Sequence, residues 1–223
     1  MVPNENHPYL FTWSTQNNHP KFYLEGTDNN YFQMKGDKNI FDLSSTSFQS
    51  SFGLHNDIIK ASIIQQLEEM PIAPAKAIFS KKDHVTNRLL DYLDLNHGKI
   101  FYTVSGAEAI ENALKLCREV TGKNIILAKK KSYHGSTLGA LSVTGDWRRN
   151  APLTVDEYTK WIPGADEDPD FSQGKKIIEK IGSDNIAGIC LETISGANGV
   201  FSASQKWWDE VQQTCQKLKR ISN

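Results

Sequence analysis

The sequence has no long apolar segment and no excess of charge of one sign. Its first residues, MVPNENHPYLFTW, lack the basic start and apolar block of a secretory signal, and no run approaches the length of a membrane helix. The 25 Lys and Arg residues are balanced by 26 Asp and Glu residues, which gives a net charge of -1. Because no long-range field would attract a nucleic acid or an anionic membrane, we predict a soluble, cytoplasmic protein that binds neither.

Cysteine is also scarce. The three cysteines, Cys117, Cys190 and Cys215, are far apart and odd in number, which excludes a disulfide framework and a CxxC metal motif. The six histidines never occur at the spacing that places two metal ligands on one helix face. A metal site built from near neighbours is therefore disfavoured, whereas one assembled from distant residues stays open.

A change of pattern divides the chain near residue 52. Residues 1–52 are polar and turn-rich, and the short runs KFYL and YFQM beside the turn sequences GTDNNY and KGDKN predict hairpin strands. Apolar residues at helical spacing then predict one helix over 56–70, which Pro71 ends, and another over 83–95. We expect an N-terminal segment over 1–52 and one main domain over 53–223.

Short apolar runs alternate with helical ones in the main domain. The runs KIFYTV (99–104), NIILA (124–128) and IAGICLE (186–192) predict buried strands, and helical spacing predicts helices up to Val120 and over 204–218. IPGADEDPDFSQG reads as a surface connection, and the triplet KKK as a solvated loop. This alternation indicates an α/β fold with a largely parallel sheet flanked by helices.

The junction between the first predicted strand and its helix has two interpretations. A helix N-terminus presents unpaired N–H groups and a partial positive charge, and Gly106 would allow a phosphate to approach the backbone closely. Ser105 followed by Glu108 is also an ordinary capping box, in which the two side chains satisfy the same donors internally. The local sequence favours the cap.

The segment TVSGAEAIENALKLCREVTGKNIILAKKKSYHGSTLGALSVTG nevertheless resembles the core of the class III aminotransferases. FGLHNDIIKASIIQQL upstream is similar to the family's Gly-His-x-x-Pro segment, and IAGICLETISGANGVF downstream to the strand and loop that usually read Glu-Pro-x-x-Gly. The resemblance covers most of residues 20–215. It implies the fold type I architecture of pyridoxal-phosphate (PLP) enzymes, with PLP as cofactor, an amine and a keto acid as substrates, and a homodimer.

The resemblance also implies roles for five residues around the junction and the Tyr-His-Gly sequence. Gly106 and Ala107 match the backbone donors that hold the cofactor phosphate, with Ser105 beside them. Tyr133 matches the aromatic residue that stacks on the pyridine ring. His134 either contacts the cofactor or shapes the turn with the glycine that follows.

Two further residues match positions near the cofactor and the substrate. Glu192 corresponds to an acidic residue at the end of its strand near the cofactor, although a carboxylate that caps the next loop is equally expected. Trp13 lies where relatives line the substrate entrance, with packing as the alternative. Ala197 stands where some relatives have a glutamate, so the resemblance implies no 4-aminobutyrate-type specificity. Thr193 in place of proline and Asn198 in place of glycine weaken any finer assignment.

A DEVQ sequence at 209–212 matches the family motif that carries the aspartate paired with the pyridine nitrogen, but the residues around it have helical spacing. We interpret it as a helix that precedes the true motif. The resemblance then places that aspartate, and the lysine that binds the cofactor covalently, beyond Asn223. Lys217 and Lys219 lie on the predicted helix and are no substitutes.

These positions predict a large domain that is truncated before its end, with poor stability and no transamination by the chain alone. Three alternatives stay open. The chain is one half of a split enzyme, or a non-catalytic protein that binds a phosphorylated ligand or a partner, or part of a racemase, aminomutase or decarboxylase of the same family.

Overall fold

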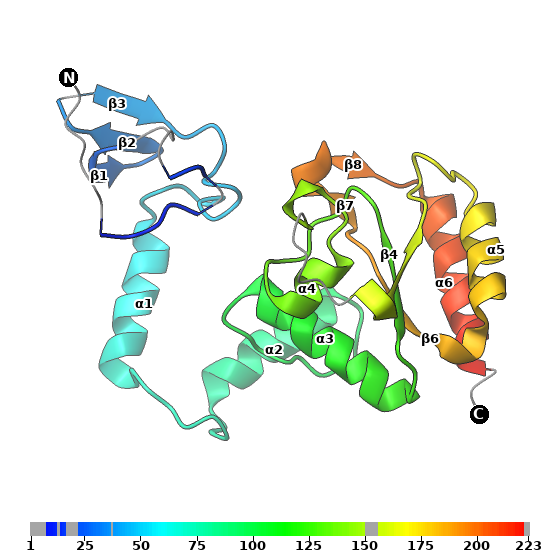
Figure 1. Cartoon of the computed structure of the whole chain (residues 1–223). Coiled ribbons are helices and arrows are strands. Elements are labelled where there is room, and N and C mark those ends of the chain that lie inside the picture. Colours follow the sequence, from blue (N-terminus) through cyan, green and yellow to red (C-terminus); the bar gives the residue numbers. More distant parts are fainter. Residues whose placement is uncertain (1–7, 13, 17–21, 37, 150–155, 221–223) are drawn as a thin grey trace. The chain divides into compact units, whose positions relative to one another are not determined.

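The computed structural model describes residues 8–12, 14–16, 22–36, 38–149 and 156–220 (Figure 1). The chain separates into two compact units, residues 1–84 and 85–223, which are described one after the other. The sequence-based boundary after residue 52 stays a prediction. In the described part of the chain, no helix is long and apolar enough to cross a membrane.

The first unit begins with a three-stranded antiparallel sheet of β1 (Leu24–Asp28), β2 (Tyr31–Met34) and β3 (Lys38–Phe41). Asp28 pairs with Tyr31, so the β1–β2 loop has two residues, and Asn29 adopts a positive φ of 49° there. The hairpin prediction is confirmed, although β1 starts at the last residue of KFYL and continues beyond it.

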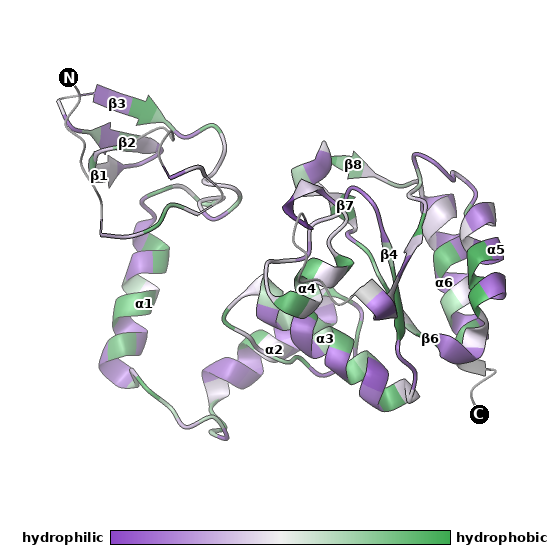
Figure 2. Ribbon diagram, in the orientation of Figure 1, coloured by the Kyte–Doolittle hydropathy of each residue, from purple (hydrophilic) through white to green (hydrophobic). Residues whose placement is uncertain are grey.

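The first unit continues with the helix α1 (Asp57–Glu69), and α2 (Ser80–Tyr92) runs across the boundary between the units. The Asn56 side chain caps α1 by accepting from the N–H groups of Ile58 and Ile59, and the helix ends before Pro71 as predicted. Neither helix contains a buried residue. Most of the apolar side chains that predicted both helices are exposed. Figure 2 shows hydrophobic residues along the ribbon of both helices.

The second unit is a three-layer α/β structure. Its sheet has the parallel order β5 (Thr159–Ile162), β4 (Ile125–Lys129), β6 (Ile186–Cys190). The helices α3 (Gly106–Thr121) and α4 (Leu138–Val143) cover one face of the sheet, and α5 (Ser172–Ile181) and α6 (Gln205–Arg220) cover the other (Figure 1). The predicted α/β fold with a parallel sheet is confirmed.

The alternation of side chains along the central strand β4 builds a core on each face. Ile126 and Ala128 pack with Leu114 and Val143 of α3 and α4. Leu127 points to the opposite face, where it belongs to a larger cluster with residues of β5, α5, β6 and α6. The other buried members of that cluster are Ile162, Phe171, Ile178, Ile186, Trp207 and Val211. A strand buried on both faces is typical of a parallel sheet.

Two sequence predictions differ from the structure. Residues 99–104 form no strand within the described chain, and Phe101, Tyr102 and Val104 are exposed, because a strand needs a neighbour with which to exchange hydrogen bonds. The IPGADEDPDFSQG segment is not merely a surface connection. Phe171 is buried in the core, and the buried Asp168 carboxylate accepts from the Gly174 N–H at the start of α5.

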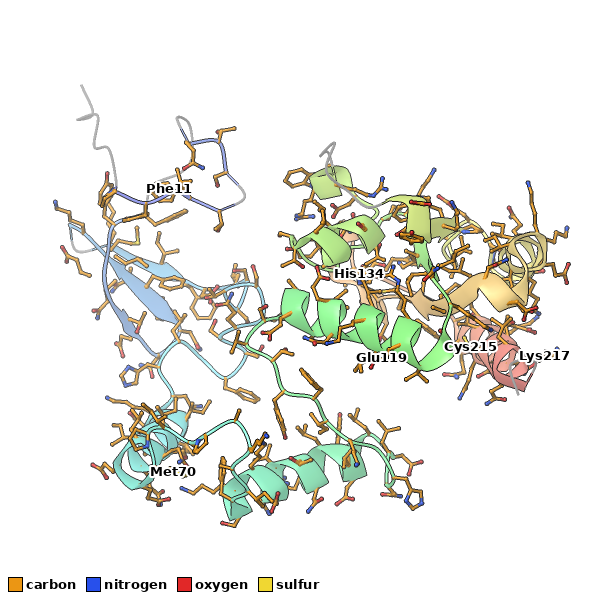
Figure 3. All side chains as sticks on the ribbon, turned by 60° about the horizontal axis from the view of Figure 1, so that its bottom comes forward. Phe11, Met70, Glu119, His134, Cys215 and Lys217 are labelled. Atoms are coloured by element: carbon orange, nitrogen blue, oxygen red, sulfur yellow. The ribbon has the colours of Figure 1, made fainter. Side chains whose placement is uncertain are left out.

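The DEVQ sequence lies inside α6, as the helical spacing predicts. Trp207 and Val211 face the core, whereas the Asp209 carboxylate accepts from Gln205 on the helix surface. Lys217 lies on the same helix (Figure 3). The remaining short elements are the 3-10 turns Trp147–Arg149, Asp156–Tyr158, Ser183–Asn185 and Gly196–Asn198 and the strand pair β7 (Ile194–Ser195) and β8 (Phe201–Ser202).

Candidate functional site

The N-terminus of α3 contains the capping interactions expected from its sequence. The Ser105 hydroxyl accepts from the Glu108 N–H at 3.2 Å, and the Glu108 carboxylate accepts from the Val104 N–H at 3.1 Å. The N–H groups of Gly106 and Ala107 belong to the first helical turn, which has no intrahelical acceptors, and no described residue accepts from them. The cap therefore satisfies its own donors and leaves two N–H groups for another acceptor.

The two glycines near this helix start have different surroundings. A Cβ placed on Gly106 would meet no atom within 4 Å, so neither packing nor a positive φ explains the glycine. A Cβ on Gly135 would lie 2.7 Å from the Ala107 Cβ, and Gly135 adopts a φ of +132°. Close packing at Gly135 thus places the Tyr-His-Gly loop directly against the first turn of α3, while the space beside Gly106 is open.

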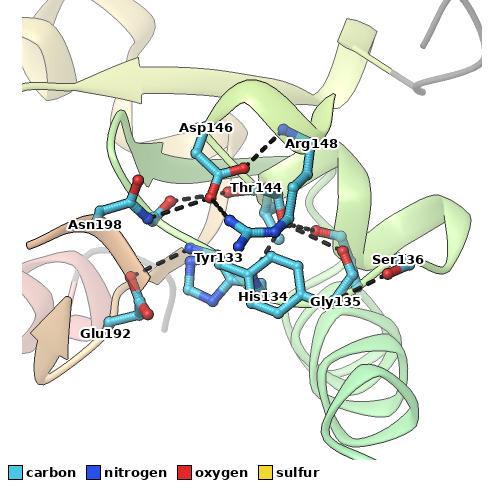
Figure 4. A network of polar contacts seen from close by, with 12 residues as sticks. Tyr133, His134, Gly135, Ser136, Thr144, Asp146, Arg148, Glu192 and Asn198 are labelled. Carbon is cyan, nitrogen blue, oxygen red and sulfur yellow. Dashed lines mark hydrogen bonds and ion pairs between the residues drawn. The ribbon is translucent and has the colours of Figure 1, made fainter. Parts of the chain in front are cut away.

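The loop that follows β4 reaches the end of β6 through Glu192. The Tyr133 N–H donates to the Glu192 carboxylate at 3.2 Å (Figure 4). Burial raises the pKa of Glu192 above its usual range, while the Tyr133 bond and the nearby Lys129 charge oppose this increase. Because Glu192 comes just after β6, it lies at the carboxyl edge of a parallel sheet, where ligands of open α/β folds commonly bind.

His134 points into the protein interior (Figure 3). The backbone N–H of His134 donates to the Thr144 hydroxyl at 3.0 Å, and its ring Nδ1 lies 3.6 Å from the Cys190 Sγ. Burial and the nearby Lys129 charge lower the pKa of His134 to about 4, and burial raises the pKa of Cys190 to about 12. A neutral, enclosed imidazole of this kind fits the turn-shaping alternative for His134.

Lys129 was not singled out by the sequence. It is the last residue of β4 and only 8% exposed, so the KKK triplet is not a uniformly solvated loop. Its ammonium group donates to the buried Ser195 hydroxyl, and burial lowers its pKa. The continuous apolar run that leads directly into this lysine is the signal that would have identified it as a strand residue.

A second group missed by the sequence lies after α4. The Arg148 Nη1 donates to the Asp146 carboxylate at 2.5 Å, and Asp146 also accepts from the Arg148 N–H at 2.9 Å and from Asn198 at 3.3 Å (Figure 4). The Arg148 guanidinium lies 4.8 Å from the centroid of the Tyr133 ring and 4.7 Å from that of Trp147. The charged residues of the sequence TGDWRR were the available signal.

The structure thus brings most of the predicted site residues together. The open helix start at Gly106 and Ala107 contacts the Tyr133–Gly135 loop, and that loop holds Glu192. Trp13 lies outside the described residues. Unpaired N–H groups at a helix start suit a phosphate, and a tyrosine ring suits a flat heteroaromatic group. In the described part of the chain, no three His, Cys, Asp or Glu side chains gather as a metal site.

Comparisons with known proteins agree with this arrangement. Acetylornithine aminotransferase of Lactiplantibacillus plantarum is 32% identical over 187 residues, which cover 80% of this chain and 43% of that protein. Diaminobutyrate–2-oxoglutarate transaminase of Marinococcus halophilus is 26% identical over 218 residues, which cover 87% of this chain and 50% of that protein. The chain thus spans about half the length of these relatives.

Solved structures show the same fold. Taurine:2-oxoglutarate aminotransferase from Bifidobacterium kashiwanohense, in complex with PLP and glutamate, superposes with a TM-score of 0.83 at 28% identity and covers 94% of this chain and 51% of its own. An amine transaminase from an uncultivated Pseudomonas species has a TM-score of 0.87 at 18% identity and covers 97% and 55%. The family model for aminotransferase class III matches residues 12–221, and the chain belongs to the class III aminotransferases.

Proposed function

We propose that this chain forms the N-terminal part of a PLP-dependent aminotransferase, which transfers an amino group between an amine or ω-amino acid and a keto acid. The observation that carries the proposal is the convergence of three features at one edge of the sheet. These are the two unpaired N–H groups at Gly106 and Ala107, the Tyr133 ring and the Glu192 carboxylate. Relatives named for 2-oxoglutarate support a keto acid as one substrate.

The residues of this chain would bind and orient the cofactor. The N–H groups of Gly106 and Ala107 would donate to its phosphate, aided by the partial positive charge of the α3 start. The Tyr133 ring would lie against the pyridine ring of the cofactor. The Tyr133 backbone N–H, which donates to Glu192, would keep this carboxylate beside the cofactor. When bound, PLP supplies the electron sink that amino-group transfer needs.

Two environmental effects at the site would favour the neutral forms of its side chains. Burial raises the pKa of Glu192, which makes this carboxyl group a better proton holder than an exposed glutamate. His134 stays neutral because its pKa is lowered, so it would not repel a proton or a cation nearby. The lysine and the pyridine-binding aspartate of the intact enzyme are proposed to come from chain outside these 223 residues.

A homodimer and a cytoplasmic location complete the proposal. The exposed isoleucines and leucine of α1 form an apolar surface of the kind that protein partners cover. The three cysteines are free thiols, as is usual in a reducing compartment. A second copy of this chain and the remainder of the enzyme are the partners that we propose for these surfaces.

The test is a titration of the purified chain with PLP, followed by absorbance and by protein fluorescence. We expect saturable binding that inorganic phosphate competes away. Gly106→Ala should weaken binding about tenfold by filling the space beside the N–H groups, which corresponds to loss of about one charge-assisted hydrogen bond. The fold should tolerate this variant because no atom lies within 4 Å of the added Cβ.

Gly135→Ala provides the contrasting variant. Its Cβ would clash with Ala107, so this variant should lose both binding and stability. Borohydride reduction and peptide mapping would then show whether any lysine is trapped. Equal affinity of wild type and Gly106→Ala would contradict the phosphate site, and specific trapping of one lysine would contradict the expectation that the essential lysine lies elsewhere.

A further inference from the structure

We propose that Glu111 is a positioning residue that couples the two halves of the proposed cofactor site. This inference rests on the aminotransferase function proposed above and adds to it a residue that the sequence did not single out. The proposed phosphate donors lie at the start of α3, whereas the Tyr133 ring belongs to the loop that leads into α4. A ligand that binds both needs them at a fixed separation, and Glu111 of α3 holds the start of α4.

Glu111 caps α4 from a different helix. Thr137 is the N-cap residue of α4, and its side chain makes no capping hydrogen bond. The Glu111 Oε1 instead accepts from the N–H groups of Gly139 at 2.7 Å and Ala140 at 3.2 Å, the second and third residues of α4. An N-cap side chain satisfies these donors in an ordinary helix. Glu111 therefore fixes the start of α4 to α3.

Gly139 is the residue that allows this carboxylate to approach. A glycine weakens a helix, and Gly139 does not adopt a positive φ that would explain it. A Cβ on Gly139 would lie 2.3 Å from the Glu111 Oε2 and 2.9 Å from the carboxyl carbon. The carboxylate thus occupies the space that the missing side chain leaves, and the two residues form a matched pair.

The capped residue Ala140 is linked to the Tyr133 loop by hydrogen bonds and by packing. Its carbonyl accepts from the buried Thr144 hydroxyl at 2.9 Å, and the same hydroxyl oxygen accepts from the His134 N–H at 3.0 Å (Figure 4). The Ala140 Cβ lies 3.0 Å from where a Cβ on Gly135 would be. A displacement of α4 would therefore move the residue next to Tyr133, and the ring with it.

Loss of the Glu111 contact should weaken PLP more than it weakens a phosphate alone. Inorganic phosphate would need only the N–H groups at the start of α3, one turn away from Glu111 along the same helix. PLP would also need the Tyr133 ring at the correct distance and angle. The ratio of the two affinities therefore reports the position of the loop relative to α3, and a general loss of stability would lower both affinities alike.

The experiment is a titration of the full chain with PLP and with inorganic phosphate, for wild type, Glu111→Ala and Glu111→Gln. We expect Glu111→Ala to weaken PLP by about tenfold or more and to change phosphate by less than about twofold. Glu111→Gln keeps an oxygen that can accept the same two N–H groups, so its PLP affinity should stay within about threefold of wild type. An unchanged PLP affinity in Glu111→Ala, or an equal loss for PLP and phosphate, would overturn the proposal.

Two further variants separate position from stability. Glu119→Ala changes an exposed glutamate of the same helix (Figure 3), and it should leave both affinities within about twofold of wild type. Gly139→Ala adds a Cβ where the carboxylate lies and should weaken PLP about as much as Glu111→Ala, although alanine favours a helix more than glycine does. Because both changes remove one contact, the double variant should be no weaker than either single variant. Additive losses in the double variant would contradict a shared contact.

Hydrogen exchange of the loop amides tests the inference independently of PLP. The His134 amide should exchange about tenfold faster or more in Glu111→Ala, and Glu111→Gln should restore its protection. If PLP does not bind to wild type but the amide responds in this way, the proposed function is wrong and the positioning role of Glu111 survives. Unchanged exchange in Glu111→Ala would overturn that role, whether or not PLP binds.

Discussion

The helices α1 and α3 are built alike, but only one of them belongs to a core. Each begins with a side-chain cap, on Asn56 and Ser105, and each has apolar residues at helical spacing. α3 buries Leu114 against the sheet, whereas in α1 Ile58 is 80% exposed. Helix formation is therefore a local outcome in both regions, and burial depends on whether a second layer is present.

This difference extends to the whole of the two units. Among the described residues of 1–84, none is buried, and both hydrophobic clusters lie in 85–223. Every candidate site residue that the structure describes also belongs to the second unit. Side chains held by a packed core keep the fixed geometry that a binding site needs. Exposed apolar helices are typical of surfaces that bind another protein.

The largest expected effect compares two leucines, one in each unit. Leu127→Ala removes a fully buried side chain from the larger cluster, and the cavity left behind should lower the free energy of unfolding by about 3 to 4 kcal/mol. Leu67→Ala changes an exposed residue of α1 and should cost less than about 1 kcal/mol. Urea denaturation of both variants measures the difference. Equal costs would show that α1 is covered in solution and would remove the contrast between the units.

The next effect is a dependence on pH between 7.5 and 4 that only the second unit should show. The pKa of His134 is about 4 in the folded chain, against 6.5 for an unperturbed histidine, so the unfolded chain binds more protons between these values. The contribution of His134 is therefore complete above about pH 6.5 and is lost as the pH falls to 4. The total change should be up to about 3 kcal/mol. Unfolding followed from pH 7.5 to 4 should show it, and an unchanged slope in His134→Asn would rule out this histidine as the cause.

The first unit should respond at a lower pH. Partial desolvation raises the pKa of Asp42, but hydrogen bonds from Ser50 and Thr46 outweigh it and lower the pKa to about 2 from 3.8. A carboxylate whose pKa is lowered by folding stabilises the folded chain at pH values above its unfolded pKa. This contribution is lost only as the pH falls below that unfolded pKa. The turn after β3 should thus persist in acid that has already weakened the surroundings of His134.

Much of this fold is predictable because its signals are local. The spacing of Ile58, Ile59 and Ile63 predicts α1, and the run NIILA predicts the central strand β4. The predicted strand over 99–104 fails because a strand depends on a distant neighbour, which no local pattern provides. The core position of Phe171 was missed for the same reason, since its burial depends on Trp207 in a helix far along the chain.

The site residues also divide into those that the sequence identified and those that it missed. Ser105, Gly106 and Tyr133 were identified by their resemblance to family motifs, and the structure brings their loops together through the contact of Gly135 with Ala107. Lys129 and Arg148 were not identified in this way. Their partners, Ser195 and Tyr133, are 66 and 15 positions away in the sequence, and no periodic pattern indicates pairs that are so far apart. A short charged stretch such as KKK or DWRR looks like a solvated surface until its partners are known.

The smallest expected effect concerns the two helix caps, where the units should behave alike. Asn56 accepts two N–H groups at 3.1 Å and Ser105 accepts one at 3.2 Å, so Asn56→Ala and Ser105→Ala should each destabilise the capped helix by about 1 kcal/mol. Hydrogen exchange in the first turn of each helix measures the local loss. Because α3 packs on the sheet and α1 buries nothing, Ser105→Ala should also lower the thermal midpoint, while Asn56→Ala should leave it unchanged. An equal fall in both midpoints would mean that α1 unfolds together with the α/β core, and the two units would then be one cooperative structure.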